Sequence, residues 1–429
     1  MPTRRRPTRS PAGSSRSRPA ATCPRWASRG TLVRPTSRRS PPRLRTRSVR
    51  NDRQNPRHRQ GAGDGSEVVD DEEVARRRLA VQRLHGEPFD HAEGVVRALL
   101  AVQAQDVEPS EWSIGMRAAD ATLDSIRAAI DGGALLRTHV LRPTWHLVHR
   151  DDLRWLLSLT APRVHVRNRP RYADLHLDAA LLDRAAGIIR EAVKGTALSR
   201  AEIGEVLTDA GIDGASGQRL AHILMYAELE QVVCSGPRRG TTQTYAALDE
   251  LAPDAGTFDR DTALRELALR FVTGHGPATR GDLQWWASLT AAAADRALDA
   301  AGDVLVRVEG GGRTYHLAPV PEPPAPPRPS VLLLQPYDEY VSGAADSRDV
   351  HDPGDLLRAA RWPRYSGLVT LDGRLVGSWR RHVRSAHVDI DLAADEAFAG
   401  AAGEALERAA WHYATFRERE LSRLTVGAP

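Results

Sequence analysis

The chain has 429 residues, enough for two or three domains, and its hydrophobic content of 41% is ordinary for a globular protein. Its two cysteines, Cys23 and Cys234, exclude a disulfide framework and a thiolate metal site, and no run of 18 apolar residues is present to span a membrane. The net charge of +5 comes from residues 1–60, which contribute +17, so the remaining 369 residues carry −12. Overall basicity is therefore no evidence that the folded part binds nucleic acid, and a binding face has to come from local patches.

Residues 1–68 form a segment of unusual composition. Residues 1–60 contain 18 arginines, no lysine and one acidic residue, Asp52, with many prolines and serines and no helical or alternating period. We expect a disordered tail. It is either an arginine-rich arm for nucleic acid or upstream sequence translated from a misplaced start codon, and both explanations stay open. The segment lacks an apolar signal-peptide stretch, so we expect a cytoplasmic protein.

Residues 69–195 are predicted to hold a first winged helix with connecting helices. The apolar spacing predicts helices near residues 71–83, 91–102 and 122–131. Two short strands are expected at residues 135–141 and 144–148, joined at Arg142-Pro143, where proline suits a turn or a strand start. Helices followed by a hairpin have the element order of a winged helix.

The same order recurs twice. In residues 196–260, Ser199 is predicted to cap a helix with Glu202 three residues later, and a helix at residues 216–230 precedes wing strands at 231–235 and 244–248. In residues 261–319, one helix precedes Gly274, two more are expected at residues 280–288 and 291–301, and a hairpin follows at 304–308 and 314–317. We therefore expect three tandem winged helices.

The period changes after a stiff proline-rich linker at residues 319–329. Strands are expected at residues 331–334, 367–371, 374–379 and 387–392, with Asp372-Gly373 as a hairpin turn, and a helix is expected at residues 394–421. Residues 330–429 are thus predicted to form a small β-barrel or sheet with a terminal helix. The fold class of the whole chain is α+β.

The most informative motif is Gln103-Ala104-Gln105, which follows an apolar helical stretch. Two amides spaced i, i+2 point the same way on an extended backbone, where they could hold one water between them. The alternative is that both glutamines cap or cross-link the loop after the helix. Asp106 is either a third carboxylate of such a site or the residue that closes a turn.

With these elements in place, the chain resembles the winged-helix DNA glycosylases of the AlkZ and YcaQ type, which unhook alkyl adducts and interstrand crosslinks. The resemblance covers about residues 70–421 in family order. The matching strings are Gln103-Ala104-Gln105, Arg142-Pro143-Thr144-Trp145-His146-Leu147-Val148, Gly274-His275-Gly276-Pro277-Ala278-Thr279 with Asp282 and Trp286, Pro336-Tyr337-Asp338-Glu339-Tyr340 with Gly343 and Arg348, and Asp372-Gly373-Arg374-Leu375-Val376-Gly377-Ser378-Trp379-Arg380-Arg381.

The resemblance implies that Gln103 and Gln105 are the catalytic residues, in the glutamine–glutamine branch of a motif whose middle residue is apolar. A neutral amide is a poor general base, but it orients water and its carbonyl dipole favours a cationic sugar. Such a site suits a base that alkylation has already made cationic, as at guanine N7. The only lysine of the chain is Lys194, and a Schiff-base lyase needs an amine, so we expect a monofunctional glycosylase that leaves an abasic site.

Arginines cluster against the acidic background and are candidate contacts to DNA phosphates, although each could instead pair with nearby acids. They are Arg137, Arg142, Arg163, Arg167, Arg169, Arg171, Arg238, Arg239, Arg380 and Arg381. Three further residues, Trp145, His146 and Asp338, either line the site or serve as a core tryptophan, a structural histidine and a buried domain-joining partner. No set of metal ligands accompanies His146 and His149.

The sequence therefore predicts a monofunctional glycosylase for alkylated, bulky or crosslinked purines that acts on double-stranded DNA containing alkyl lesions. We expect a monomer with no metal, no cofactor and no membrane partner. The alternative is a noncatalytic winged-helix DNA-binding protein or regulator built from the same modules.

Overall fold

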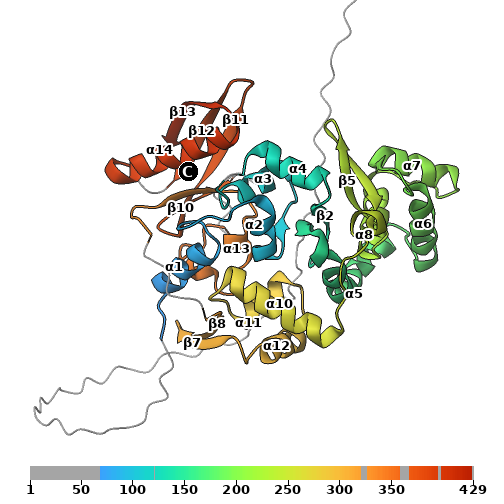
Figure 1. The fold of residues 1–429 in the computed structure, drawn as a ribbon, viewed down its shortest axis with the longest axis horizontal. Helices are drawn as coiled ribbons and strands as arrows, with labels where there is room; N and C mark the ends of the chain where they lie inside the picture. Colours follow the sequence, from blue (N-terminus) through green and yellow to red (C-terminus); the bar gives the residue numbers. More distant parts are fainter. Residues whose placement is uncertain (1–67, 120, 320–325, 358–366, 395–397, 428–429) are drawn as a thin grey trace, which may run out of the picture. The chain divides into compact units, whose positions relative to one another are not determined.

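The computed structural model describes residues 68–119, 121–319, 326–357, 367–394 and 398–427, and Figure 1 shows its elements. Helices and strands are mixed, as an α+β fold requires. The tail predicted at residues 1–68 lies outside the described residues, apart from Val68, and so does the middle of the predicted linker, residues 320–325. Helix α1 (Asp71–Val81) is the first element described.

The first repeat carries the two glutamines. Its elements are α2 (Ala92–Leu99), β1 (Val102–Gln103), α3 (Val107–Gly115), α4 (Leu123–Asp131), β2 (Leu135–His139) and β3 (Trp145–His149). The three strands are antiparallel, and the last strand lies in the middle, in the order β1-β3-β2. The short strand β1 is therefore held directly against the hairpin strand β3.

Two connecting helices, α5 (Arg150–Asp174) and α6 (Ala179–Ala192), lead into a second repeat. Its elements are β4 (Leu198–Ser199), α7 (Arg200–Asp209), α8 (Gly217–Leu229), β5 (Val233–Arg239) and β6 (Thr242–Ala247), followed by the short helix α9 (Leu248–Leu251). The sheet order β4-β6-β5 matches that of the first repeat. The predicted capping box at the start of α7 is confirmed, because Ser199 and Glu202 each cap the other's backbone N–H.

A third set of elements follows the same order. It consists of α10 (Arg260–His275), α11 (Arg280–Trp286), α12 (Ala291–Ala300), β7 (Val306–Gly310) and β8 (Arg313–Leu317). In place of a first strand, Ala278 makes a single bridge to His316 of β8. The first two repeats thus share a strand, helices and a hairpin in a three-stranded sheet, and the third keeps the helices and the hairpin but has only a bridge where the first strand would lie.

The C-terminal part is an open sheet. Its elements are β9 (Val331–Leu334), α13 (Glu339–Ser342), the 3-10 helix η1 (Arg348–Val350), β10 (Gly367–Leu371), β11 (Arg374–Val383), β12 (His387–Ala394), α14 (Gly400–Phe416) and β13 (Glu420–Gly427). The strand order β13-β12-β11-β10-β9 has two free edges among the described residues, so of the two predicted alternatives the structure shows a sheet and not a barrel. Helix α14 packs against β9 and β13 (Figure 1).

The terminal helix predicted at residues 394–421 is too long. Helix α14 begins at Gly400 and ends at Phe416, and Glu418 turns the chain with a φ of +54°. The chain then enters β13, which pairs parallel to β12. Pairing between strands distant in sequence leaves no local helical or alternating signal in an exposed edge strand, which explains the error.

The apolar core joins the first repeat to the C-terminal sheet. Leu99 and Val102 belong to the same buried cluster as Trp379 of β11 and Tyr413 of α14. Helix α10 also packs closely on α2, because a Cβ at Gly274 would lie 2.3 Å from the Ala98 carbonyl oxygen. Strand β1 and the end of α2 therefore pack within the first repeat, and this repeat also packs against the C-terminal sheet and helix α10. No helix in the described part of the chain is both long and apolar enough to cross a bilayer.

Candidate active site

A tight turn delivers Gln103 to the sheet. Leu100, which is fully buried, has a φ of +65°, and the Ala101 N–H donates to the Leu99 carbonyl over 2.7 Å. A three-residue turn around a non-glycine residue with positive φ is rare and strained, and such strain is concentrated at functional sites. The turn ends α2 and starts β1, in which Gln103 pairs with His146.

Residues on either side of Gln103 face the apolar core. Val102 and Ala104 are buried in the apolar cluster beneath the strand. Extended backbone continues beyond β1, because the Ala104 N–H donates to the Trp145 carbonyl over 2.8 Å. Side chains alternate along an extended segment, so Gln103 faces away from this cluster. Gln105 follows Ala104 at a bend of the chain, and a pair of amides that share one face stays a prediction.

Gln103 is fixed by three polar groups from two distant segments of the chain. The Arg142 Nη2 donates to its side-chain oxygen over 2.8 Å, and its backbone N–H donates to Glu339 Oε1 over 2.8 Å. The Gln335 amide donates to the Gln103 carbonyl over 3.2 Å. The side chain is 6% exposed. Because Arg142 takes the amide oxygen, the amide orientation is set by this network.

Arg142 supports the glutamine, which differs from its predicted role. It is 7% exposed, and its Nη1 donates to the Trp286 carbonyl over 3.0 Å. Burial lowers the pKa of its guanidinium to about 10, although Glu339 raises it, so it stays charged at neutral pH. The prediction of a phosphate contact at Arg142 is therefore corrected, because its donors are occupied inside the protein.

Glu339, on α13, is the functional residue that sequence reasoning missed. It is fully buried, receives the Gln103 N–H on one oxygen, and receives the Trp286 indole N–H on the other over 2.8 Å. Burial alone would raise its pKa, but the His275 ring at 3.4 Å and Arg142 lower it to about 2. Its negative charge therefore balances Arg142 beside the glutamine. It belongs to a string that carried the family resemblance, which was the only available signal.

Gln105 is held through its backbone and not its side chain. Arg137 donates from Nε to the Ala104 carbonyl over 2.9 Å and from Nη2 to the Gln105 carbonyl over 3.2 Å. The Arg137 guanidinium lies over the Trp145 ring, 3.9 Å from its centroid. The half-buried side chain of Gln105 makes no hydrogen bond to another described residue, which leaves its amide oxygen available as an acceptor. Asp106 is exposed at the N-cap position of α3, and its side chain makes no capping hydrogen bond to the described residues.

Two of the predicted lining residues serve the scaffold. His146 is fully buried; its Nδ1 faces the Thr144 carbonyl at 3.0 Å and its Nε2 faces Arg142 at 3.3 Å. Burial, with Arg142 adding to it, lowers the pKa of His146 to about 3, so the ring is neutral and structural. Asp338 is also fully buried and pairs with Arg117 over 2.6 Å, which ties α3 to α13. Trp145 is half-buried under Arg137.

The predicted basic groups divide into open and paired residues. On α5, Arg163, Arg167 and Arg169 are exposed, and Arg163 and Arg167 lie on one face because they are four residues apart. Arg167 also donates to the Ser288 hydroxyl just after α11. The remaining arginines have acidic partners or mixed exposure: Arg171 lies 3.8 Å from Asp174, Arg238 makes a two-armed pair with Asp131, Arg239 pairs with Glu202, Arg381 lies 3.5 Å from Glu108, and Arg380 is exposed on β11.

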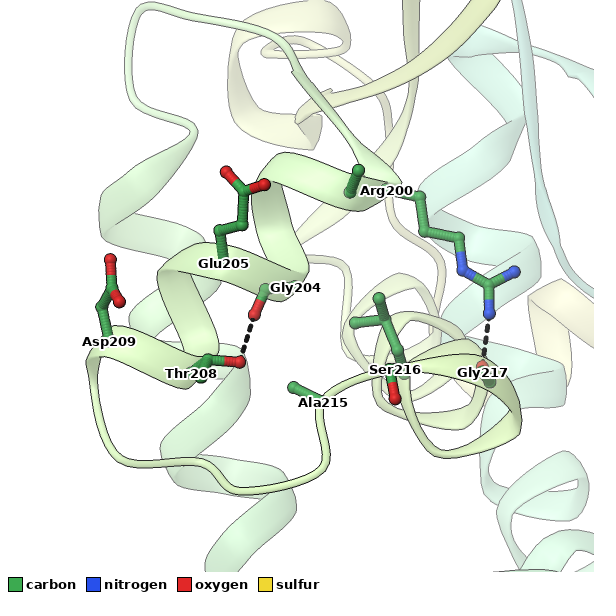
Figure 2. Close-up of a pocket in the computed structure, with 10 residues that line it drawn as sticks. Arg200, Gly204, Glu205, Thr208, Asp209, Ala215, Ser216 and Gly217 are labelled. Carbon is green, nitrogen blue, oxygen red and sulfur yellow. Dashed lines mark hydrogen bonds between the residues drawn. The ribbon is translucent and has the colours of Figure 1, made fainter. Parts of the chain in front are cut away.

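A pocket in the second repeat is unrelated to the glutamines. It lies between α7 and the start of α8 and is lined by Arg200, Glu205, Thr208 and Ser216 among others (Figure 2). Arg200 donates to the Gly217 carbonyl, and Thr208 donates to the Gly204 carbonyl within its own helix. These local hydrogen bonds explain the polar side chains, so we place the candidate site at Gln103 and not here.

The order of the elements and the Gln103-Ala104-Gln105 motif are the features on which the resemblance to a class of DNA glycosylases rests. The profile of the AlkZ-like DNA glycosylase family matches residues 96–416, so the chain belongs to that family and the resemblance is confirmed. An interstrand DNA cross-link repair glycosylase of Streptomyces sahachiroi is 26% identical over 327 residues, which are 70% of this chain and 85% of the relative. The solved structure of the Streptomyces sahachiroi DNA glycosylase AlkZ matches with a TM-score of 0.72 at 22% identity, over 85% of this chain and all of that chain. The latter similarity shows a shared fold.

Proposed function

We propose that the chain is a monofunctional DNA glycosylase that hydrolyses the N-glycosidic bond of alkylated, bulky or crosslinked purines of the N7-alkylguanine type. The observation that carries the proposal is the hydrogen bond from the buried Arg142 to the Gln103 side-chain oxygen, over 2.8 Å. It holds one amide of the pair in a single orientation. Gln105, whose side chain has no partner among the described residues, then supplies a second acceptor for the same water.

The chemistry follows from these roles. The nucleophilic water donates a hydrogen bond to the Gln105 oxygen and contacts the Gln103 amide, which together direct its lone pair at C1′ of the sugar. As the water oxygen bonds to C1′, the bond between C1′ and the base nitrogen breaks, its electron pair leaves with the base, and the proton that the water loses passes to solvent. Neither amide is basic enough to keep that proton, so the reaction depends on a leaving group that departs easily. An N7-alkylated guanine is cationic and leaves as a neutral base, which matches a weak catalyst to an activated substrate.

The charge around the glutamine fits such a substrate. An unbalanced guanidinium beside Gln103 would repel both a cationic base and the positive charge that develops on the sugar. Glu339 is ionised and buried close to Arg142, and it cancels that repulsion. The structure thus supports a site that accepts positive charge although an arginine lies at its centre.

We further propose that the three repeats are winged-helix modules and that α5 carries a DNA-binding face. Arg163, Arg167 and Arg169 are exposed basic residues in the second half of this helix, and Arg167 reaches the end of α11 beside Trp286. Lys194, the only lysine, is exposed beyond α6 and pairs with Glu191 over 2.7 Å. It gives no support to a Schiff-base lyase, which is consistent with an intact abasic product.

Crosslink repair enters the proposal through the printed name of the relative from Streptomyces sahachiroi. The test is base release from three duplexes, with N7-methylguanine, with a bulky N7 adduct and with an N7–N7 interstrand crosslink. We expect free base and a strand that breaks only after heating in alkali. Tight binding of undamaged DNA with no release from any of the three would favour a noncatalytic DNA-binding protein or regulator instead.

A further inference from the structure

Trp285 is an exposed aromatic residue beside a buried site. Its indole is 46% exposed, whereas the next residue, Trp286, is fully buried against Phe271 and His275. Both come from α11 of the third repeat. A single exposed aromatic side chain is ordinary at a protein surface, so the groups around it decide whether it has a role in binding.

One face of the Trp285 ring is tied to the glutamine. The Arg142 guanidinium carbon lies 4.5 Å from the centroid of the indole, and the same guanidinium donates to the Gln103 side-chain oxygen over 2.8 Å. A single planar group therefore separates the indole from the amide. The exposed 46% of Trp285 therefore belongs to the part of the residue that Arg142 leaves uncovered.

A positively charged side chain that could bind a DNA phosphate lies close to Trp285 in the chain's fold. Ser288, three residues further along, accepts a hydrogen bond from the exposed Arg167 of α5. The indole of Trp285 and the guanidinium of Arg167 match the two parts of a nucleotide, since bases stack on aromatic rings and arginines bind phosphate.

We propose that the open face of Trp285 stacks on the damaged purine while Gln103 and Gln105 face its sugar. The proposal rests on the function proposed above and adds the residue that recognises the leaving base. Stacking suits every purine, but an N7-alkylated purine is cationic and gains an additional attraction to the electron-rich face of an indole. Trp285 therefore contributes to the preference for damaged over undamaged DNA.

The experiment compares the wild-type protein with Trp285→Ala, Trp285→Phe and the control Trp411→Ala, whose indole is 52% exposed on α14. Binding to a duplex with one N7-methylguanine and to the same duplex undamaged is measured by fluorescence anisotropy at fixed salt, and equal urea midpoints confirm that all four proteins are folded. We expect Trp285→Ala to weaken binding of the damaged duplex about tenfold. Binding of the undamaged duplex should change less than twofold, Phe should restore most of the loss, and Trp411→Ala should match the wild type.

The proposal is overturned if the Trp285→Ala protein keeps the wild-type ratio of affinities for the damaged and undamaged duplexes. An equal loss of affinity for both duplexes would be such a result. A wild-type protein with no preference for the damaged duplex overturns it as well. Base release is measured on the same samples, so the two proposals can fail separately. Lesion binding that depends on Trp285 without base release would refute the glycosylase function alone.

Discussion

Replacing Arg142 by methionine tests how much the site depends on a held amide. Methionine keeps an unbranched side chain of similar length and removes the guanidinium. The change deletes the 2.8 Å hydrogen bond to the Gln103 oxygen, the 3.0 Å bond to the Trp286 carbonyl and the stacking on Trp285. It also removes one of the groups that lower the pKa of Glu339 and leaves His275 in place.

The expected magnitudes follow from these contacts. A hydrogen bond from a charged donor contributes about 1.5–3 kcal/mol, and the loss of this amount of positioning from Gln103 corresponds to a roughly 10- to 150-fold slower base release. Two buried acceptors lose their donor, each at a cost of about 1–3 kcal/mol, so the free energy of unfolding should fall by about 2–6 kcal/mol.

The assay is single-turnover release of N7-methylguanine at saturating enzyme, together with urea denaturation of each protein. Arg142→Lys is the companion variant, because it keeps the charge but lacks the planar fork that reaches both acceptors, and we expect an intermediate rate. Arg97→Met is the control, since Arg97 pairs with Asp151 at the surface. A folded Arg142→Met protein that releases base within twofold of the wild-type rate would refute the role given to Arg142.

Three further predictions concern stability and DNA binding. Asp338→Asn should lower the free energy of unfolding by about 3–5 kcal/mol in urea denaturation, because Arg117 would lose its partner in a fully buried pair; a loss below about 1 kcal/mol would contradict this. Burial, with Arg142 adding to it, lowers the pKa of His146 to about 3 in the folded protein from an ordinary value of 6.5. The unfolded chain therefore binds a proton at a higher pH than the folded protein does. The contribution of the neutral ring to the free energy of unfolding is fully present above pH 6.5 and falls as the pH drops toward 3. Between pH 7 and pH 5 the free energy of unfolding should fall by about 2 kcal/mol for this reason. In His146→Gln the fall between these two pH values should be smaller by that amount, and an equal fall in both proteins would contradict the prediction. Arg163→Ala/Arg167→Ala should reduce the salt dependence of DNA binding by about two in the slope of log K against log salt, and an unchanged slope would exclude contacts of these two side chains with phosphates.

The elements that could be predicted are those with strong local signals. The Ser199 capping box sets the start of α7, and Asp372-Gly373 forms the predicted hairpin turn with φ angles of +50° and +82°. Helix α3 was missed because its residues from Pro109 to Gly115 are all buried, so it has no polar face to create a helical period. Strand β1 has two residues, which is too short for any alternation to register.

The same limit applies to the site. Gln103 and Gln105 could be identified from a short motif and the strings that accompany it. The groups that hold Gln103 could not, because Arg142 is 39 residues away and Glu339 is 236 residues away. Charge clustering alone grouped Arg142 with the exposed arginines of α5, although burial separates their roles. Sequence shows which chemistry is available, whereas tertiary packing decides which side chains supply it.

The most direct test of the central claim is the single-turnover rate of base release from a duplex with one N7-methylguanine, measured for the wild type, Gln103→Ala/Gln105→Ala and the surface control Gln218→Ala. If the two amides position the water, the double variant should stay folded, bind the damaged duplex and release base at least a hundredfold more slowly, while the control keeps the wild-type rate. A folded double variant that releases base at the wild-type rate would show that the glutamine pair does not catalyse the reaction.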